Sequence, residues 1–259
     1  MHVISIGILG IMGRMGQAIS GLIQKDPQFQ LIGGTLNPES NHIIHETSLC
    51  LSTSPDLIFE KSDILIDFTN PETLIKHLNL SKIYNKPIVI GTTGLTKNHH
   101  DFIDEAAATI PILYAPNMSL GINVLHALVE KAASILGPQF DIEILEKHHN
   151  QKIDAPSGTA LSLGQAAAKG RNVNFEDQSV LNWVGHPKRK ENEIGFAVQR
   201  GGDMAGEHIV SFFGPQERIE LSHSASSRQV LAYGALKAAS WIYQKKPGRY
   251  SMMDVLNLK

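Results

Sequence analysis

The segment Val3–Ile19, VISIGILGIMGRMGQAI, decides the fold. Its first part, up to Leu9, is rich in β-branched residues and predicts a buried strand. Three glycines follow at intervals of three residues: Gly10, Gly13 and Gly16. Apolar residues then recur at helical spacing until an Asp-Pro pair ends the pattern: Met15, Ala18, Ile19, Leu22 and Ile23.

Glycines between a strand and a helix let the backbone approach a pyrophosphate, and the helix N-terminus offers free N–H groups. We therefore expect a dinucleotide-binding βαβ unit. An ordinary glycine-rich turn is the alternative, because the spacing is GxxGxxG and not GxGxxG.

Short β-rich runs continue to alternate with helical patterns through the first half of the chain. The expected strands are Phe29–Thr35, Asp63–Phe68, Pro87–Ile90 and Pro111–Tyr114. Helices are expected from Pro71, capped by Thr69 or Asn70, and after Thr96. This alternation is typical of βαβ units, so we predict an α/β fold with a Rossmann-type, doubly wound parallel sheet.

The pattern changes after Pro116. A long apolar helix is expected over 119–137, and the alternation in Phe140–His149 predicts a half-buried strand. Three more strands are expected in an antiparallel sheet with one face toward solvent: Glu193–Arg200, Glu207–Phe213 and Glu217–Ala225. A loop with a short helix is expected over 171–193, and a last helix, 228–244, could pack back on the first half. The chain is thus predicted to form two domains, one of residues 1–117 with 229–259 and an α+β domain of residues 118–228.

Composition excludes several classes of protein. The chain has 259 residues, 42% of them apolar and 19% charged, with a formal net charge of -2, so a nucleic-acid partner is not expected. The N-terminal apolar run is shorter than the ~20 residues that span a bilayer, so no membrane association is expected. A single cysteine, Cys50, fits a reducing compartment, and we expect the cytoplasm.

The densest polar chemistry lies in Glu146–Ala160, EKHHNQKIDAPSGTA. Adjacent histidines on a strand point to opposite faces, so His148 and His149 cannot easily clamp one metal ion, and no metal site is expected. A histidine that titrates near neutrality suits proton donation, and Lys152 supplies a cation or a second acid. Asp154 or Ser157 could cap a helix whose first N–H groups, at Gly158 and Thr159, would form a second anion site. Two anion sites predict a small dicarboxylate ligand.

The carboxyl ends of the first strands are expected to hold the rest of a cofactor. Asn37 can hydrogen-bond a ribose hydroxyl at the end of the second strand, where an acid would favour NAD and a base NADP. Arg14 could contact a phosphate. The sequence GTTG, from Gly91, follows a strand and would lie in the ligand-binding crevice of such folds. By itself each of these segments could be a plain turn.

Taken together, these residues resemble the 4-hydroxy-tetrahydrodipicolinate reductase (dihydrodipicolinate reductase) family of the bacterial diaminopimelate and lysine pathway. The resemblance covers nearly the whole chain and rests on GxxGRMG, GTTG, APNMSLGINVL, EKHHNQKIDAPSGTA and RGGDMAGEH. It implies a homotetramer in which a Rossmann domain, completed by the C-terminal helix, binds the cofactor. The second domain would bind substrate and build the tetramer. The implied reaction is reduction of 4-hydroxy-tetrahydrodipicolinate to tetrahydrodipicolinate by NAD(P)H, with loss of water.

Site residues follow from the resemblance position by position. His148 would be the proton donor and Lys152 the second catalytic group, while His149, Gly158 and Thr159 would bind the substrate carboxylates. The implied cofactor residues are Gly10, Ile11, Met12, Gly13, Arg14 and Met15 at the pyrophosphate, and Gly91, Thr92, Thr93, Ala115, Pro116, Asn117 and Met118 around the nicotinamide.

Two departures from the family bear on the cofactor. Many members have Glu-Arg after the second strand, where this chain has Asn37-Pro38, and an arginine is frequent where it has Thr69-Asn70. Loss of both basic residues weakens recognition of a 2′-phosphate, so we expect NADH to be favoured, with some use of NADPH.

Two other functions remain open from the sequence. One is another oxidoreductase with the same two-domain plan, acting on sugars or on aspartate semialdehyde. The other is a non-catalytic NAD(P)-sensing protein, which would not need His148 together with Lys152.

Overall fold

The computed structural model describes residues 2–37 and 49–258, so the predicted contribution of Pro38 lies outside the described residues. The chain splits into two compact units, one of Met1–Leu120 with Gln229–Asn257 and one of Gly121–Arg228. No helix within the described ranges is both long and apolar enough to cross a membrane.

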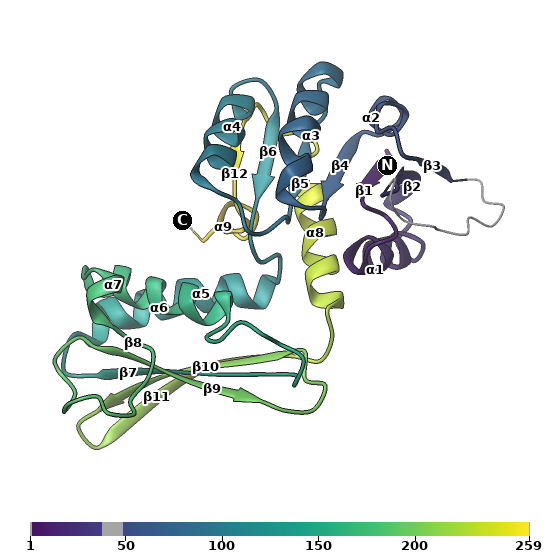
Figure 1. The fold of residues 1–259 in the computed structure, drawn as a ribbon. Coiled ribbons are helices and arrows are strands. Elements are labelled where there is room, and N and C mark those ends of the chain that lie inside the picture. The colour runs from purple at the N-terminus through teal and green to yellow at the C-terminus, as the bar shows by residue number, and fades with distance from the viewer. Residues whose placement is uncertain (1, 38–48, 259) are drawn as a thin grey trace. The chain divides into compact units, whose positions relative to one another are not determined.

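The first unit contains a seven-stranded sheet in the order β12-β6-β5-β4-β1-β2-β3, and all its pairings are parallel (Figure 1). Its strands are β1 (Ile4–Leu9), β2 (Phe29–Thr35), β3 (Cys50–Ser52), β4 (Ile64–Asp67), β5 (Ile88–Ile90), β6 (Pro111–Tyr114) and β12 (Gly248–Tyr250). Its helices are α1 (Arg14–Ile23), α2 (Asp56–Lys61), α3 (Pro71–Tyr84), α4 (Lys97–Ala107), α8 (Gln229–Ile242) and α9 (Met252–Val255). The strand order reverses between β1 and β4, which is where such sheets bind ligands. The predicted Rossmann-type sheet is confirmed.

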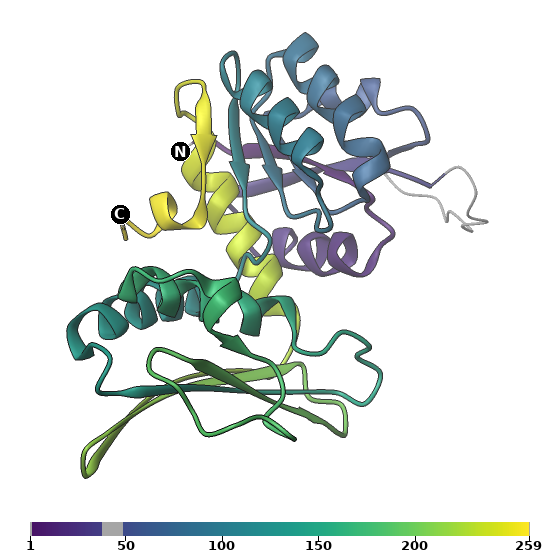
Figure 2. The ribbon, with the colours of Figure 1, turned by 60° about the vertical axis from the view of Figure 1, so that its left-hand side comes forward.

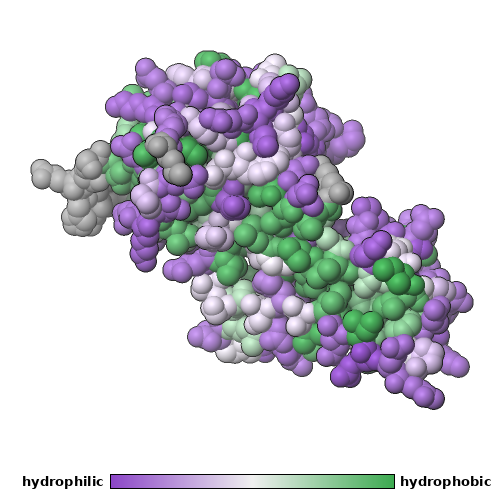
Figure 3. All heavy atoms as spheres, turned by 180° about the vertical axis from the view of Figure 1, so that it is seen from behind, coloured by the Kyte–Doolittle hydropathy of each residue, from purple (hydrophilic) through white to green (hydrophobic). Residues whose placement is uncertain are grey.

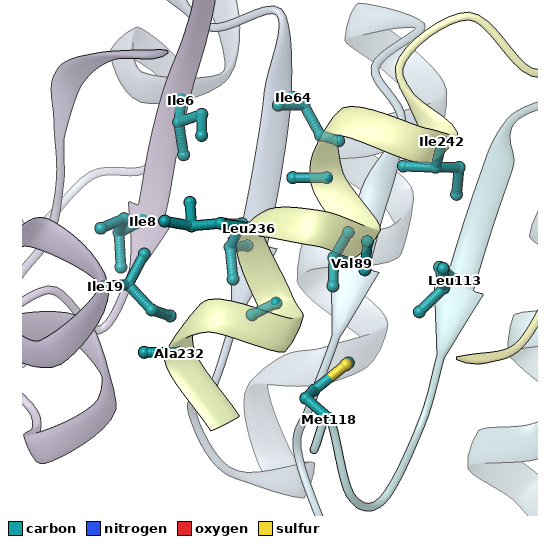
Figure 4. Close-up of a cluster of buried hydrophobic side chains, with 14 of the residues drawn as sticks. Ile6, Ile8, Ile19, Ile64, Val89, Leu113, Met118, Ala232, Leu236 and Ile242 are labelled. Atoms are coloured by element: carbon teal, nitrogen blue, oxygen red, sulfur yellow. The ribbon is translucent and has the colours of Figure 1, made fainter. Parts of the chain in front are cut away.

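Helices cover both faces of this sheet (Figure 2). One core cluster joins α1 and α8 to the sheet, and another joins α2, α3 and α4 to its other face. Figure 4 shows α8 lying across the strands, with Leu236 and Ala232 among side chains such as Ile8 and Val89. Small residues allow this close approach, since a Cβ added at Gly234 would lie 1.8 Å from the carbonyl oxygen of Met118. Helix α8 is therefore part of the core of the first unit.

The second unit contains a five-stranded sheet in the order β11-β10-β7-β9-β8. Its elements are α5 (Leu120–Leu136), β7 (Asp141–His148), α6 (Gly158–Arg171), α7 (Phe175–Gln178), β8 (Ser179–Val180), β9 (Ile194–Arg200), β10 (Gly206–Gly214) and β11 (Glu217–Ala225). Helices α5 and α6 pack on one face of the sheet.

The prediction of an antiparallel sheet in this unit was wrong. The strand β7 pairs antiparallel with β10 but parallel with β9, and β8 also pairs parallel with β9. A parallel pair needs a long crossover connection, and the segment from α6 to β8 supplies one between β7 and β9. The sheet is mixed.

Local signals explain where the helices begin. Asn70 caps α3 by accepting a hydrogen bond from the N–H of Thr73 at 3.2 Å, which decides between the two expected caps. Thr96 caps α4, as expected. Five short elements were not expected, because they lack a periodic apolar pattern: β3, α2, β8, β12 and α9.

Candidate functional site

The glycine turn after β1 has the geometry of a phosphate cradle. Gly10 has φ +79°, a conformation that side chains rarely adopt, and its N–H donates to the Thr35 hydroxyl at 2.8 Å. A Cβ added at Gly16 would lie 2.4 Å from the carbonyl oxygen of Ile11, so only glycine fits where α1 approaches the turn. The first turn of α1 carries no acidic residue, and its cap, Gly13, adds no side chain to cover the N–H groups. These residues fit a dinucleotide pyrophosphate.

A cavity of about 710 Å³ opens beside this turn. Four of the residues expected at the cofactor line it: Gly10, Met12, Gly13 and Asn37. Residues from the start of α3 also line it, and Lys76 is the one lysine or arginine among its described lining residues. Ile11 is buried, while Met15 is half-buried and Arg14 is exposed on α1. The carboxyl ends of β1, β2 and β4 thus share one cavity.

Asp67, the last residue of β4, is buried at the same edge of the sheet and has several hydrogen-bond partners. One carboxylate oxygen accepts hydrogen bonds from the Thr69 hydroxyl at 2.6 Å and the Thr92 hydroxyl at 3.2 Å. The other lies 2.8 Å from Nδ1 of His77, which is also buried. Asp67 therefore ties the start of α3 to the GTTG segment.

The residues predicted around the nicotinamide follow β5 and β6, which are neighbours in the sheet. Thr92 is buried on Asp67, and Gly91 packs so closely on the Phe68 ring that a Cβ would lie 2.1 Å from it. In the second segment the Ala115 N–H donates to the carbonyl of Ile90 at 3.1 Å. The rest of the set differs in burial: Thr93 and Pro116 are exposed, Asn117 is half-buried and Met118 is buried. The structure brings these two segments to one edge of the sheet.

His148 is the last residue of β7 and is buried, with 9% of its surface exposed. Its Nδ1 lies 2.5 Å from a carboxylate oxygen of Glu146, which is 0% exposed. Two nitrogens of Arg200 donate to the two oxygens of Glu146, at 2.9 and 2.7 Å. Burial lowers the pKa of His148, and the Glu146 carboxylate offsets part of that effect. The strand therefore carries a buried Arg-Glu-His chain.

His149 and Lys152 lie in the loop that follows β7. The N–H of His149 donates to the Met204 carbonyl at 2.9 Å, and its side chain is half-buried. Both carboxylate oxygens of Asp154 bind Nζ of Lys152, at 2.7 and 2.8 Å. This ion pair lowers the pKa of Asp154. Among the described residues, no group of three histidine, cysteine or acidic side chains could hold a metal ion.

Ser157 caps α6, which decides between the two caps that the sequence allowed. Its hydroxyl accepts from the N–H of Ala160 at 3.1 Å and lies 3.2 Å from Nε2 of His208. Gly158 and Thr159 are the first residues of the helix, whose first turn has no acidic residue. A Cβ added at Gly158 would meet nothing within 4 Å, so the backbone there is open. This helix start can receive an anion.

The sequence reasoning missed four residues of these networks: Glu146, Arg200, His208 and Asp67. A signal existed for Glu146, because the alternation that buries Ile142 and Ile144 continues to Glu146 and His148 on the same face of β7. The other three depend on which strands and helices become neighbours.

Comparisons with known proteins give a consistent result. The family model described as dihydrodipicolinate reductase, N-terminus, matches residues 4–118 of this chain. The family model described as dihydrodipicolinate reductase, C-terminus, matches residues 121–256. The 4-hydroxy-tetrahydrodipicolinate reductases of Zymomonas mobilis and Chromohalobacter salexigens are 45% and 41% identical, each over 98% of both chains. A dipicolinate-bound dihydrodipicolinate reductase structure from Paenisporosarcina sp. TG-14 has a TM-score of 0.80 at 23% identity, covering 98% of this chain and 99% of that chain. This last likeness concerns the fold.

Proposed function

This chain belongs to the dihydrodipicolinate reductase family, and from that premise we propose how its residues carry out the reaction. The protein is an oxidoreductase that reduces 4-hydroxy-tetrahydrodipicolinate to tetrahydrodipicolinate on the diaminopimelate route to lysine. A nicotinamide dinucleotide supplies the hydride. The observation that carries the assignment of roles is the buried His148 beside a helix start and a lysine.

His148 is proposed as the proton donor. Its Nδ1 is engaged with Glu146, and Nε2 has no hydrogen-bond partner within the described ranges, so Nε2 is the nitrogen from which a proton can leave. A positioned general acid of this kind contributes roughly 10²–10⁴-fold to a rate. Lys152 is the second catalytic group in this proposal, and it needs to leave Asp154 at least in part to act on the substrate.

The two substrate carboxylates are proposed to bind at the loop and at the helix start. Lys152 and His149 offer positive or donor groups from the loop, and the backbone N–H groups of Gly158 and Thr159 offer donors and the helix dipole. Dipicolinate, the ligand named for the Paenisporosarcina structure, is a planar dicarboxylate of the same class as the substrate. It is therefore a suitable probe for this site.

The first unit is proposed to hold NADH in preference to NADPH. The cradle of Gly10 to Met15 would bind the pyrophosphate, and Asn37 the ribose. Neither Thr69 nor Asn70 provides a cation, and both side chains are already hydrogen-bonded, to Asp67 and to Thr73. Lys76, exposed at the cavity, is proposed to allow some use of NADPH by contacting the 2′-phosphate. The segments Gly91–Thr93 and Ala115–Met118 would border the nicotinamide.

The second unit is proposed to bind substrate and to build a homotetramer. Helices cover one face of its sheet, while the other face carries Leu145, Ile209 and Phe213, the last 40% exposed. Figure 3 shows apolar side chains gathered on the surface of this unit, at the lower right of the view. Three exposed apolar residues of the unit belong to α5: Val124, Leu128 and Ile135. Apolar surfaces of this kind mark protein interfaces. We also propose the cytoplasm, which the free Cys50 fits.

A coupled assay tests the proposed roles. Pyruvate and aspartate semialdehyde are condensed enzymatically, and oxidation of NADH and of NADPH is followed with the wild type and with His148→Gln. We expect turnover with both cofactors, faster with NADH, and a loss of at least about 100-fold in the variant. A folded wild type that oxidises neither cofactor contradicts the reductase function, whereas a variant as fast as the wild type removes His148 from the mechanism.

A further inference from the structure

The motif RGGDMAGEH, from Arg200 to His208, has no part in the roles described so far. Strand pairing brings its two ends to the proton donor, because Arg200 is opposite His148 in the β7–β9 register and His208 is opposite Glu146 in the β7–β10 register. Its middle also touches the site, since a Cβ added at Gly206 would lie 2.9 Å from Nε2 of His148. The motif thus surrounds Glu146 and His148 on two sides.

Glu146 accepts hydrogen bonds from three different parts of the chain. Arg200 donates through both terminal nitrogens, His148 lies at 2.5 Å, and the N–H of Ser157 donates at 3.0 Å. The carboxylate is fully buried, and a buried charge persists only when it is paired and hydrogen-bonded. Burial by itself would raise the pKa of Glu146. The hydrogen bonds from Arg200 and His148 together lower the pKa by more than burial raises it, so the pKa lies below its ordinary value. Glu146 is therefore ionised.

We propose that Glu146, clamped by Arg200, is a positioning residue that fixes the tautomer of His148 and ties this proton donor to the helix start at Ser157. The inference rests on the reductase function proposed above. An ionised carboxylate can only accept hydrogen bonds, so Nδ1 of His148 must carry a proton. Any second proton on the ring is then on Nε2, the nitrogen that is free to donate. The carboxylate also favours the doubly protonated ring, which a buried histidine otherwise loses.

A purely structural Glu-Arg pair on the same strand provides the comparison. Glu143, also on β7, binds Arg189 and the indole N–H of Trp183, and within the described part of the chain it has no hydrogen bond to a histidine. Buried ion pairs are weak evidence for stability by themselves, because the cost of removing two charges from water can exceed their attraction. What distinguishes Glu146 is its two further partners: His148, the proposed proton donor, and Ser157, which caps the proposed anion-binding helix start.

The second link runs from Glu146 to α6. The bond to the Ser157 N–H fixes the residue that caps the helix, and the Ser157 hydroxyl in turn lies 3.2 Å from Nε2 of His208. Burial, followed by the nearby His148, lowers the pKa of His208 to about 4, so this ring is neutral and shares one hydrogen bond with the Ser157 hydroxyl through Nε2. The orientation of the proton donor and the position of the anion-binding helix start therefore depend on one carboxylate.

The test compares the wild type with Glu146→Gln and with the double variant Glu146→Gln/Arg200→Gln. The single variant leaves the charge of Arg200 without its carboxylate partner, and the double variant removes that charge. Glu143→Gln is the control. In both Glu146 variants we expect kcat to fall by about 10–100-fold. The limb of the pH–rate profile where activity is lost on raising the pH should move to lower pH. Because the introduced amide carbonyl can still accept from the Ser157 N–H, the Kd of dipicolinate should change by less than about threefold. Glu143→Gln should leave kcat and the pH profile unchanged.

A second readout does not depend on turnover. Imidazole ¹⁵N NMR, with the His148 signals identified from their absence in His148→Gln, should show the Nδ1-protonated tautomer in the wild type and the Nε2-protonated one in Glu146→Gln. A wild-type ring protonated on Nε2 alone, or a folded double variant with the kcat and pH profile of the wild type, overturns the proposal. Absence of turnover in the wild type with the expected tautomer would instead contradict the reductase function and leave the tautomer assignment standing.

Discussion

Replacing Ser157 with alanine removes both hydrogen bonds of the hydroxyl that caps α6. Loss of the cap bond to the N–H of Ala160 costs about 1 kcal/mol. The ring nitrogen of His208, in a residue only 4% exposed, loses its partner as well, which costs about 1–3 kcal/mol. We therefore expect the free energy of unfolding of the second unit to fall by roughly 2–4 kcal/mol. Because the helix start frays, the Kd of dipicolinate should also rise.

Tryptophan fluorescence can report this change in one unit. Trp183 lies in the second unit and Trp241 in the first, so a Trp241→Phe background confines the signal to the unit that contains Ser157. Urea titration then gives the free energy of unfolding. Asn174→Ala is the matched control, since Asn174 caps α7 without contacting a buried histidine and should cost no more than about 1 kcal/mol. If Ser157→Ala costs no more than this control, the reasoning about His208 is wrong.

Three further predictions concern the cofactor cradle, cofactor choice and acid stability. Gly16→Ala should abolish NADH binding in a fluorescence titration, because the new Cβ would lie 2.4 Å from the carbonyl oxygen of Ile11. The control is Gly21→Ala on the same helix, whose new Cβ would have no neighbour within 4 Å, and this variant should bind NADH as the wild type does. Lys76→Ala should lower kcat/KM for NADPH about tenfold and leave kcat/KM for NADH unchanged, since a phosphate contact to a lysine contributes about 1.5 kcal/mol. The control Lys82→Ala, on the same helix, should change kcat/KM for neither cofactor. Equal losses with both cofactors in Lys76→Ala would refute the assignment. The pKa of His208 is lowered from 6.5 to about 4 in the folded state, so the unfolded chain takes up its proton first as the pH falls. The contribution of His208 to the free energy of unfolding should therefore fall by about 3 kcal/mol between pH 6.5 and 4. The stability of the wild type should decline more steeply over this range than that of His208→Asn, and parallel pH curves for the two proteins contradict this.

Much of the first unit could be predicted because its strands and helices carry their own periodic patterns. The strand Ile4–Leu9, the glycine turn and the amphipathic helix after it are all local features, and the parallel sheet follows from the alternation of such strands and helices. The short strands β3 and β12 could not be predicted, because neither contains a run of β-branched residues like the one that marks the equally short β5. Their place at the edges of the sheet depends on pairing with β2 and β6.

The networks around the site depended on contacts that are distant in sequence. The alternation on β7 could have placed Glu146 beside His148 on the buried face, but Glu146 was not predicted as a site residue. Arg200 and His208 reach Glu146 only because β9 and β10 flank β7 in one particular register, and the expected antiparallel sheet had no parallel partner for β7. Asp67 was missed for a similar reason, because its partner His77 comes from the helix after it. Local patterns predict elements, whereas these contacts depend on which elements become neighbours.

The central claim is that this chain reduces the dicarboxylate with His148 as the proton donor. The most direct measurement follows NADH oxidation and product mass together, with purified wild type and His148→Gln at equal concentration. We predict one NADH oxidised for each tetrahydrodipicolinate formed by the wild type. The variant should bind dipicolinate and NADH but form product at least about 100-fold more slowly. Product formation by the variant at the wild-type rate, or NADH oxidation without tetrahydrodipicolinate, would contradict the account.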